Sequence, residues 1–369
     1  MNSFEIFCAC PPGLESVLAR EVAGAGFADV VATGGGVQFH GTWHDVWRAN
    51  LCLRGATRVL ARIGSFRAFH LAQLDKRARA FPWGDWLTKD ASVRVEVTTN
   101  RKSKIYHAGA AQERIERAIA EELGAPIAGA DEAQVTVKAR IDDNNVILSL
   151  DTSGEGLHKR GFKLGVGKAP LRETMAALLL SACGYDGREP VVDPMCGSGT
   201  FPIEAAEIAR GLLAGRGRSF AFELFTNFEA NAFAAMKEVT PRETDLAFYG
   251  SDRNVAVIGM AGENATRAGV GDLCTFTPHP VSGLTRPEGP AGLVIVNPPY
   301  GARVGKKKDL FALYGAFGDK MRAEFTGWRV GMVTSDENLA HATRLPWKPK
   351  SAPIAHGGLK VRLYQTDKL

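Results

Sequence analysis

The fold is decided by the stretch Val191-Val192-Asp193-Pro194-Met195-Cys196-Gly197-Ser198-Gly199-Thr200-Phe201-Pro202-Ile203-Glu204-Ala205-Ala206. A short apolar strand ends in an acid, runs through a Gly-x-Gly turn and enters a helix near Thr200. Glycines let a backbone approach a ligand closely, and the free N–H groups at a helix start favour a carboxylate or a phosphate. Many turns need glycine for steric reasons alone, but the acid at the strand end favours a binding role.

This motif lies within an alternation of helices and strands that begins near residue 165. We expect helices at 171–183, 200–209 and 256–268, and strands at 190–192, 247–250 and 292–296. Such alternation is typical of a mostly parallel, doubly wound sheet, in which ligands bind at the carboxyl ends of the strands. The sequence therefore predicts an α/β fold for this half of the chain.

The first half of the chain has a different pattern. We expect strands at 4–9, 37–39, 93–98, 134–140 and 145–151, and helices at 13–25 and 110–123. The polar turn at 142–145 predicts a hairpin, so this half is expected to form one or two small α+β modules. Glycines at several positions of 152–168 make that segment the expected connector.

A second acid, Asp252, ends the apolar strand that begins at Phe248. A carboxylate in this position can accept both hydroxyls of a ribose, and the simpler alternative is a cap for the following helix. Asp252 follows Asp193 at far more than the roughly 20 residues of a dinucleotide-binding fold. A Rossmann dehydrogenase therefore fits poorly, and residues 161–168 lack the pattern of a phosphate-binding P-loop.

The third motif is the apolar strand 293–296 followed by Asn297-Pro298-Pro299-Tyr300-Gly301. The amide of Asn297 and the carbonyl of Pro298 are two acceptors that can hold an amino group by its hydrogens. The ring of Tyr300 offers a face for a base. A simple turn is the alternative, but it is disfavoured because all three motifs fall at strand ends of one expected sheet.

The composition is that of a folded protein. A chain of 369 residues, 45% hydrophobic and 23% charged, predicts two or three domains at about 150 residues each. We expect no membrane span and no signal peptide, because the apolar runs are short and the first residues lack a basic and apolar leader. Six cysteines without a paired framework suit a reducing cytoplasm. Nothing in the sequence indicates an oligomeric state.

No metal site is expected. His40, His44 and His107 have no zinc-ligand spacing with cysteines, and Cys8-x-Cys10 is interpreted as strand packing. Cys196 lies in the glycine turn, but the sequence places no base beside it. We interpret it as a small loop residue rather than a nucleophile.

Basic residues outnumber acids in two segments, 54–79 and 158–168, although the net charge of the chain is only +5. They are Arg54, Arg58, Arg62, Arg67, Lys76, Arg77 and Arg79 in the first segment, and Lys159, Arg160, Lys163 and Lys168 in the second. Such clusters can neutralise the phosphates of a nucleic acid. Solvated helix faces and connectors are an equally good interpretation.

The motifs resemble a known family. Residues 193–200 together with 297–301 look like the S-adenosylmethionine-dependent, amino-group methyltransferases of class I fold. More narrowly, Leu157-His158-Lys159-Arg160-Gly161, Ala169-Pro170-Leu171-Arg172-Glu173-Thr174 and Gly357-Gly358-Leu359 resemble the THUMP-domain RNA methyltransferases, closest to the bacterial 23S rRNA (guanine-N2) enzymes of RlmL type. The resemblance implies a ferredoxin-like module at 1–55, a THUMP RNA-binding domain at 56–155 and a Rossmann-like catalytic domain at 156–369.

The resemblance also implies roles for the motif residues. The cofactor, S-adenosylmethionine, would be bound by Asp193, Pro194, Met195, Cys196, Gly197, Ser198, Gly199, Thr200, Asp252 and Asn297. Asp193 would hold its amino group, Asp252 its ribose, and the two glycines its methionine part. The catalytic residues would be Asn297, Pro298, Pro299 and Tyr300, which grip the target amine.

One departure from the family concerns the adenine of the cofactor. Where the family has an acid that reads the adenine amino group, this chain has Pro280, within Thr277-Pro278-His279-Pro280-Val281. The expected activity is methylation of a guanine N2 amine in RNA, most specifically 23S rRNA. Alternatives are a tRNA guanine-N2 enzyme, an adenine-N6 methyltransferase of DNA or RNA, and a nonenzymatic RNA-binding factor.

Overall fold

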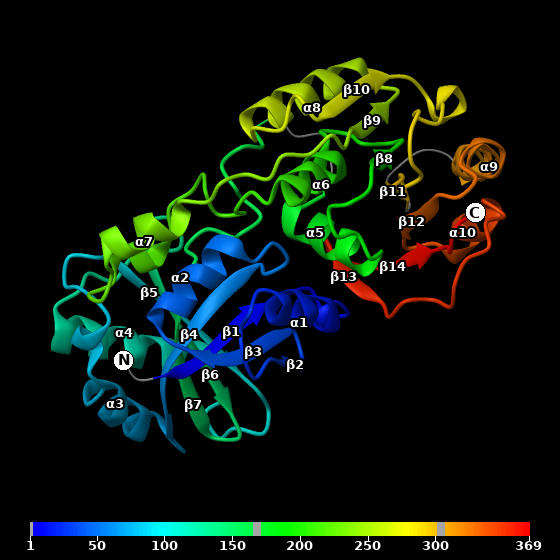
Figure 1. Ribbon diagram of the computed structural model, residues 1–369. Helices are drawn as coiled ribbons and strands as arrows, with labels where there is room; N and C mark the ends of the chain where they lie inside the picture. Colours follow the sequence, from blue (N-terminus) through cyan, green and yellow to red (C-terminus); the bar gives the residue numbers. More distant parts are fainter. Residues whose placement is uncertain (1–2, 165–170, 301–306) are drawn as a thin grey trace. The chain divides into compact units, whose positions relative to one another are not determined.

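The computed structural model describes residues 3–164, 171–300 and 307–369. These residues form two compact units, each with its own sheet (Figure 1). The first unit comprises residues 1–9, 22–157 and 218–238, and the second comprises 10–21, 158–217 and 239–369. The expected third domain, 156–369, is therefore interrupted, because residues 218–238 pack with the first unit.

The first unit is built on a seven-stranded sheet in the order β2-β3-β1-β4-β7-β6-β5. Its strands are β1 (Phe4–Ala9), β2 (Val31–Thr33), β3 (Gly36–Gly41), β4 (Arg58–Arg67), β5 (Val93–Thr99), β6 (Val135–Asp142) and β7 (Asn145–Asp151). Strand β4 pairs with β1 on one side and with β7 on the other, so the two modules expected from the sequence share one sheet. The expected hairpin at 142–145 joins the antiparallel strands β6 and β7.

Aromatic packing explains why residues 218–238 belong to the first unit. This segment supplies η2 (Ala221–Leu224) and α7 (Ala230–Lys237). Phe222 is fully buried, and its ring centroid lies 5.0 Å from that of Phe233 and 6.2 Å from that of Trp47. The segment 218–238, which lies between Asp193 and Asp252 in the sequence, is thus a piece of the first unit's core. The remaining helices of this part of the chain are α1 (Glu15–Gly24), α2 (Trp43–Cys52), α3 (Leu71–Arg79), η1 (Trp83–Asp85) and α4 (Ala108–Leu123).

The second unit has the expected doubly wound sheet, in the order β10-β9-β8-β11-β12-β14-β13. Its strands are β8 (Val191–Asp193), β9 (Phe248–Asp252), β10 (Cys274–Pro278), β11 (Leu293–Val296), β12 (Arg329–Thr334), β13 (Ile354–His356) and β14 (Leu359–Gln365). The strands from β10 to β12 in this order are parallel, and β14 is antiparallel to β12. Strand β8 lies between β9 and β11, which is the point where the strand order reverses and ligands bind in such sheets.

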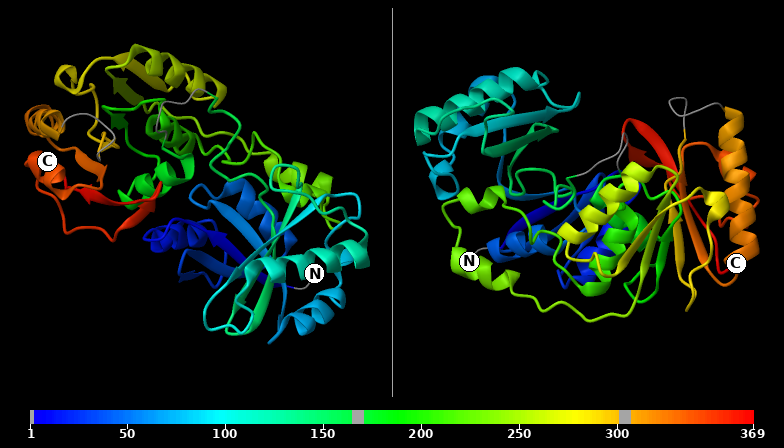
Figure 2. Two further views of the ribbon diagram at one scale, coloured as in Figure 1. Left: turned by 180° about the vertical axis from the view of Figure 1, so that it is seen from behind. Right: turned by 90° about the horizontal axis from the view of Figure 1, so that it is seen from above.

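Helices cover both faces of this sheet, as Figure 2 shows. They are α5 (Glu173–Ala182), α6 (Thr200–Arg210), α8 (Val255–Arg267), η3 (Val281–Gly283), α9 (Lys307–Glu324) and α10 (Glu337–Ala342). Helices α5, α6 and α8 lie on one face, and α9 lies on the other. All four residues of β11 are buried because both faces are covered, which is why this strand reads as an uninterrupted apolar run. Trp328, Phe317 and Phe325 fill the core beside α9.

None of the helices in the described parts of the chain has the length and apolar character needed to cross a membrane. Some residues quoted from the sequence motifs, namely Gly165, Gly167, Lys168, Ala169, Pro170 and Gly301, lie outside the described residues.

Candidate active site

The three sequence motifs meet at the carboxyl edge of the second sheet. Asp193 ends β8, Asp252 ends the neighbouring strand β9, and Asn297 follows β11 on the other side of β8. The glycine turn is tied to β9 by two hydrogen bonds. Cys196 N donates to the carbonyl of Ser251 at 2.9 Å, and Gly197 N donates to Asp252 Oδ2 at 3.2 Å. The turn is therefore held over the edge where ligands bind in this class of sheet.

The two glycines of the turn are needed for different reasons. Both have positive φ, +52° at Gly197 and +85° at Gly199, where a side chain is strained. A Cβ at Gly199 would come within 3.0 Å of Ala261 and Phe276, so this glycine allows α6 to pack closely. A Cβ at Gly197 would meet no described atom within 4 Å. Gly197 therefore borders open space, as expected of a backbone that a ligand approaches.

Asp193 is a buried carboxylate at the centre of this edge. Its side chain is only 3% exposed, and Oδ1 accepts a hydrogen bond from Met195 N at 3.0 Å. Burial and, to a smaller extent, the nearby charge of Asp252 raise the pKa of Asp193 to about 8, against the lowering effect of that hydrogen bond. A cation placed beside Asp193 would relieve this electrostatic penalty.

Asp252 accepts two backbone hydrogen bonds and does not cap a helix. Its Oδ1 accepts a hydrogen bond from Asn254 N at 2.9 Å, in addition to the bond that Oδ2 accepts from Gly197. Helix α8 is capped by Asn254, whose Oδ1 accepts from Ala256 N at 3.0 Å. The capping alternative raised by the sequence is therefore wrong, because the cap residue is Asn254.

Several residues of the glycine turn are buried in the protein or pack against its core. Ser198 is buried, and its carbonyl accepts a hydrogen bond from Asn264 Nδ2 at 3.2 Å. Cys196 is also buried, and burial raises the pKa of its thiol, which keeps the sulfur protonated and unreactive. Pro194 is buried, and Met195 packs against the core beside α9. These residues therefore pack within the protein.

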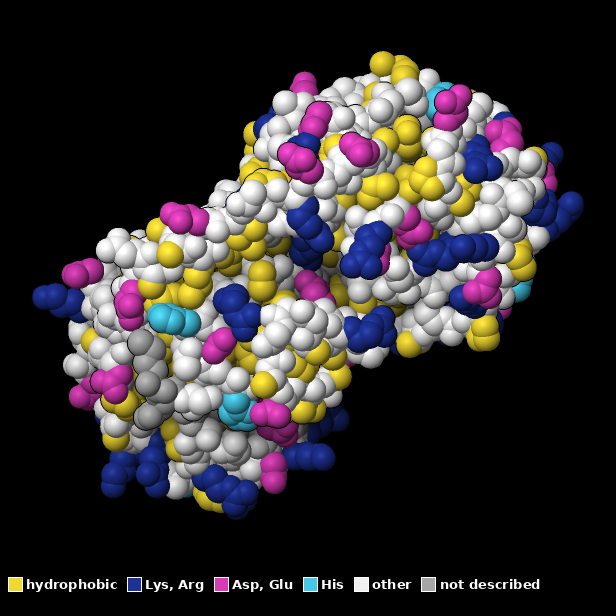
Figure 3. Space-filling model, viewed as in Figure 1, with side chains coloured by type: hydrophobic (Ala, Val, Ile, Leu, Met, Phe, Trp, Pro, Cys, Tyr) yellow, Lys and Arg dark blue, Asp and Glu magenta, His cyan; other side chains and the backbone are white. Residues whose placement is uncertain are grey.

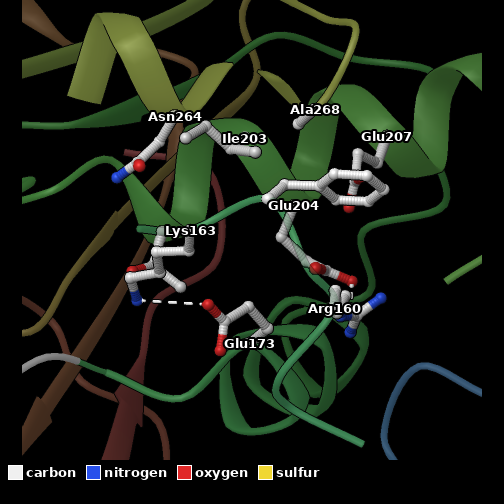
Figure 4. Close-up of a pocket in the computed structure, with 10 residues that line it drawn as sticks. Arg160, Lys163, Glu173, Ile203, Glu204, Glu207, Asn264 and Ala268 are labelled. Atoms are coloured by element: carbon white, nitrogen blue, oxygen red, sulfur yellow. Dashed lines mark hydrogen bonds and ion pairs between the residues drawn. The ribbon is translucent and has the colours of Figure 1, made fainter. Parts of the chain in front are cut away.

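A network of buried charges holds the start of α6 (Figure 4). Lys163 Nζ donates to Thr200 Oγ1 and to the carbonyl of Leu171, both at 2.8 Å, and lies 3.4 Å from Glu173. Burial lowers the pKa of Lys163 and raises that of Glu173, while each charge offsets the effect on the other. The Thr200 hydroxyl therefore serves the protein interior. The cavity among these groups is about 30 Å³, room for about one water.

Several cations of the two basic segments are paired with acids rather than free at the surface. Arg160 and Glu204 are an almost fully buried ion pair at 3.2 Å, so this arginine of the second segment lies in the interior. In the first segment, Arg58, Arg62 and Arg79 form ion pairs with acids of the same unit. Arg58, Arg62, Arg79 and Arg160 are therefore neutralised within the protein, and phosphate binding by the other basic residues of the two segments stays a prediction.

The turn after β11 presents an acceptor without a partner. Asn297 Oδ1 is buried, and no hydrogen-bond partner for it exists among the described residues. Tyr314 OH donates a hydrogen bond to the carbonyl of Pro299 at 3.2 Å, which restrains the turn. Pro298 is buried and Tyr300 is partly exposed, and burial raises the pKa of Tyr300 so that its ring stays neutral. An unsatisfied amide oxygen in a rigid turn is suited to bind a donor on a ligand.

A cavity of about 300 Å³ opens beside the ends of β8, β9 and β10. It is lined by Val192, Tyr249, Gly250, Ser251, Thr275, Thr277, His279, Gly283, Leu284, Thr285 and Pro287. Pro280, which replaces the expected acid, precedes η3 at the rim of this region. Hydroxyl and imidazole groups of Thr275, Thr277 and His279 therefore line this cavity. Over residues 3–164, 171–300 and 307–369, no group of three or more His, Cys, Asp or Glu side chains could hold a metal ion.

Comparison with known proteins identifies the second unit. Residues 160–363 match the RMKL-like methyltransferase domain family. The chain belongs to this methyltransferase family. Its first half matches the RlmL ferredoxin-like domain at residues 5–60 and the THUMP domain at 69–151. The fold expected from the resemblance is therefore confirmed.

Relatives of this methyltransferase are known in sequence and in structure. The ribosomal RNA large subunit methyltransferase K/L of Vibrio cholerae is 34% identical over 90% of this chain. The chain spans only about half the length of the curated relatives it matches, 49% of each of the first ones. A predicted N6-adenine-specific DNA methylase from Listeria monocytogenes is 31% identical, with a TM-score of 0.88 over 100% of this chain and 97% of that chain. A methyltransferase complexed with SAH is 26% identical, also with a TM-score of 0.88, over 100% of this chain and 99% of that chain.

Sequence reasoning missed the groups that support the methyltransferase site. Of these groups, the sequence singles out only Lys163, and it does so as a member of the basic segment 158–168 rather than as a support of α6. Tyr314 lies in a helix whose pattern is that of an ordinary core helix, so its hydroxyl bond to the motif turn has no sequence signature. Such supporting contacts connect residues far apart in the chain.

The burial of Asp193 predicts an unusual pH dependence of stability. Because its pKa is raised on folding, the native state binds a proton more tightly than the unfolded state, and this group lowers stability as pH rises from about 4 towards 8. The effect is at most about 1.4 kcal/mol per pH unit. We expect Asp193→Asn, which retains an oxygen for Met195 N, to remove it. Urea denaturation of both proteins between pH 5 and pH 8 measures the difference, and parallel stability curves would contradict the assignment.

Proposed function

We propose that this protein transfers a methyl group from S-adenosylmethionine to the exocyclic N2 amine of a guanine in RNA, specifically large-subunit (23S) ribosomal RNA. The observation that carries the proposal is the buried, unpartnered Asn297 Oδ1 at the same sheet edge as Asp193 and the Gly197 turn. A carboxylate pair, an open glycine turn and an amide acceptor are what transfer from this cofactor to an amine requires.

The residues present fit the cofactor. Asp193 is a buried carboxylate whose charge needs a cation, and it would bind the ammonium group. Gly197 borders open space and would lie against the methionine part, while Asp252 would accept the ribose hydroxyls. The cavity beside Thr277 and His279 is the proposed place of the adenine. S-adenosylmethionine supplies a methyl group already activated on a sulfonium, so the protein acts mainly by positioning.

The turn after β11 would hold the target amine. A guanine N2 amine is a weak nucleophile because its lone pair is delocalised into the ring. Asn297 Oδ1 and the Pro298 carbonyl would each accept one amine hydrogen, which directs the nitrogen lone pair towards the methyl group. Tyr300 would stack on the base, and Tyr314 would keep the turn rigid through its bond to Pro299. The proton released after transfer can pass to water.

The domain matches support RNA as the substrate. We assign the ferredoxin-like module to residues 1–55, the THUMP RNA-binding domain to 56–155 and the catalytic domain to 156–369, with the segment 218–238 inserted into the first unit. The curated relatives are named as methyltransferases of large-subunit ribosomal RNA, which supports that RNA over tRNA. The buried free thiols of Cys10, Cys183 and Cys196 suit a reducing compartment, and we propose the cytoplasm.

Adenine-N6 methylation is the second candidate. An Asn-Pro-Pro-Tyr turn can hold an adenine N6 amine by the same two acceptors, and the Listeria relative is described as an adenine-specific enzyme. The two candidates differ in the methylated nucleoside, which chemical analysis distinguishes.

Asp252→Ala is expected to weaken cofactor binding by about 10- to 100-fold, because charge-assisted hydrogen bonds contribute roughly 1.5–3 kcal/mol. Isothermal titration with S-adenosylmethionine measures the affinity. The matched control is Asn254→Ala, which removes the cap of α8 and lowers stability without touching the ribose. Undiminished affinity in a folded Asp252→Ala protein would mean that this carboxylate only holds the Gly197 turn.

Large-subunit ribosomal RNA from a strain lacking the enzyme is expected to yield N2-methylguanosine when it is incubated with the protein and S-adenosylmethionine. Mass spectrometry of the digested nucleosides identifies the product. In single-turnover reactions at saturating cofactor, Asn297→Ala should react about 10²- to 10³-fold more slowly, because it loses one transition-state hydrogen bond. Its affinity for the cofactor should stay within a few-fold of wild type, since Asp193, Gly197 and Asp252 are retained.

The outcomes of this experiment separate the candidates. N6-methyladenosine as the product would establish the second candidate, and the absence of any methylated nucleoside would contradict both. A near-native rate for Asn297→Ala would show that the turn after β11 is scaffold. Asn254→Ala serves again as the control, because it changes an amide near the site that we assign no part in holding the amine.

A further inference from the structure

Three segments far apart in the sequence meet at one end of the first unit's sheet. They are residues 66–70 at the end of β4, residues 100–107 after β5, and the turn 142–145 between β6 and β7. Asn144 joins them: its carbonyl accepts from Ala68 N at 2.9 Å, and its Oδ1 accepts from Lys104 N at 2.8 Å. Asn144 has a φ of +59°, in keeping with a tight two-residue turn. We call this region the loop end; it is the lower end of the first unit in Figure 1.

The loop end carries two exposed aromatic side chains. Tyr106 is 65% exposed and Phe69 is 39% exposed. The other Phe, Tyr and Trp residues that the structure describes are buried or half-buried. The ring of Tyr106 lies 4.3 Å from that of His107, and Lys104 Nζ lies 5.5 Å from the centroid of Phe69. Solvent-exposed aromatic rings that cluster on one surface of a protein indicate a binding site.

The same end carries unneutralised positive charge. Arg67, Arg101, Lys102 and Lys104 are all exposed. None of them forms an ion pair with any residue of the described chain, in contrast to Arg58, Arg62 and Arg79. Of the two acids in the turn, Asp142 is bound by Asn100 and Arg140 and only Asp143 is free. Dark-blue side chains gather along the corresponding lower margin of the first unit in Figure 3.

The combination of exposed rings and free cations fits single-stranded nucleic acid. Cations neutralise phosphates whatever the sequence, and each aromatic face can stack on an unpaired base. A duplex hides its base faces, and an acidic protein would use the cations without needing the rings. The loop end therefore has the chemistry of a surface for unpaired nucleotides.

We propose that the loop end binds an unpaired stretch of the RNA substrate, with Tyr106 and Phe69 stacking on bases and Arg67, Arg101, Lys102 and Lys104 contacting phosphates. The proposal rests on the proposed function in taking RNA as the substrate. It assigns RNA binding to residues that are far apart in the sequence and come together only in the folded protein.

The test measures RNA binding by the full-length protein. The probes are a fluorescein-labelled single-stranded RNA of 12 mixed nucleotides and the corresponding duplex, titrated by anisotropy at several KCl concentrations. Tyr106→Ala and Phe69→Ala are each expected to weaken single-strand binding by about 5- to 150-fold, which corresponds to roughly 1–3 kcal/mol per stacked base. Duplex binding by these variants should be unchanged. Tyr106→Phe keeps the ring and should bind as wild type.

The charged residues should respond differently. The double variant Arg101→Ala, Lys102→Ala is expected to weaken binding of both probes and to flatten the salt dependence by about 0.7 in log–log slope per lost phosphate contact to the single strand. Lys89→Ala removes an exposed lysine that precedes β5, at the opposite end of this strand from the loop end, and is the matched control. It should leave affinity and slope unchanged.

Unchanged single-strand affinity in folded Tyr106→Ala and Phe69→Ala proteins would overturn the proposal. So would a pattern in which only the charge variants bind more weakly, which would indicate a phosphate or acidic-protein surface instead. Methylation by the wild-type protein separates this result from failure of the proposed function. If ribosomal RNA is methylated while the aromatic variants bind single strands normally, the loop-end proposal is wrong and the proposed function stands. If no RNA is methylated while the aromatic variants lose single-strand binding, the proposed function is wrong and the loop-end proposal stands.

Discussion

The buried carboxylate of Asp193 is the constraint on which the site depends. It ends the central strand β8, where the strand order reverses, and only 3% of the residue is exposed. A carboxylate removed from water is held in its charged form only when a donor or cation satisfies it. The protein provides one backbone N–H, from Met195, and leaves the pKa raised to about 8. In the free protein a proton removes the charge near neutral pH, and in the proposed complex the ammonium group of the cofactor would balance it.

The surrounding structure keeps this carboxylate and its neighbours in place. Hydrogen bonds from Cys196 and Gly197 fasten the turn to β9, and close packing at Gly199 sets the position of α6. Lys163, which is paired with Glu173, donates a hydrogen bond to the hydroxyl of Thr200 at the start of α6. These contacts fix the positions of the site residues. Positioning is the main requirement for catalysis when the transferred methyl group is already activated.

The sequence predicted what is local and missed what is assembled from distant residues. The strands β8, β9 and β11, with the polar residues that end them, were readable because each motif is a continuous stretch that alternates apolar strand with turn. The packing of residues 218–238 into the first unit was not readable, because Phe222 and Phe233 look the same whichever core receives them. The pairing of buried charges was not readable for the same reason. Arg160 lies beside Lys159 in sequence but pairs with Glu204 in the interior.

Proton release on cofactor binding tests the account most directly. S-adenosylhomocysteine carries the same ammonium group and can be titrated calorimetrically at pH 7 in two buffers of different ionisation enthalpy. Free Asp193 is mostly protonated at this pH, so binding of the ammonium group should release about one proton, and affinity should rise by up to about tenfold per pH unit between pH 6 and 7.5. Asp193→Asn should bind without proton release. Wild-type binding that releases no proton and does not change with pH would contradict the placement of the ammonium group at Asp193.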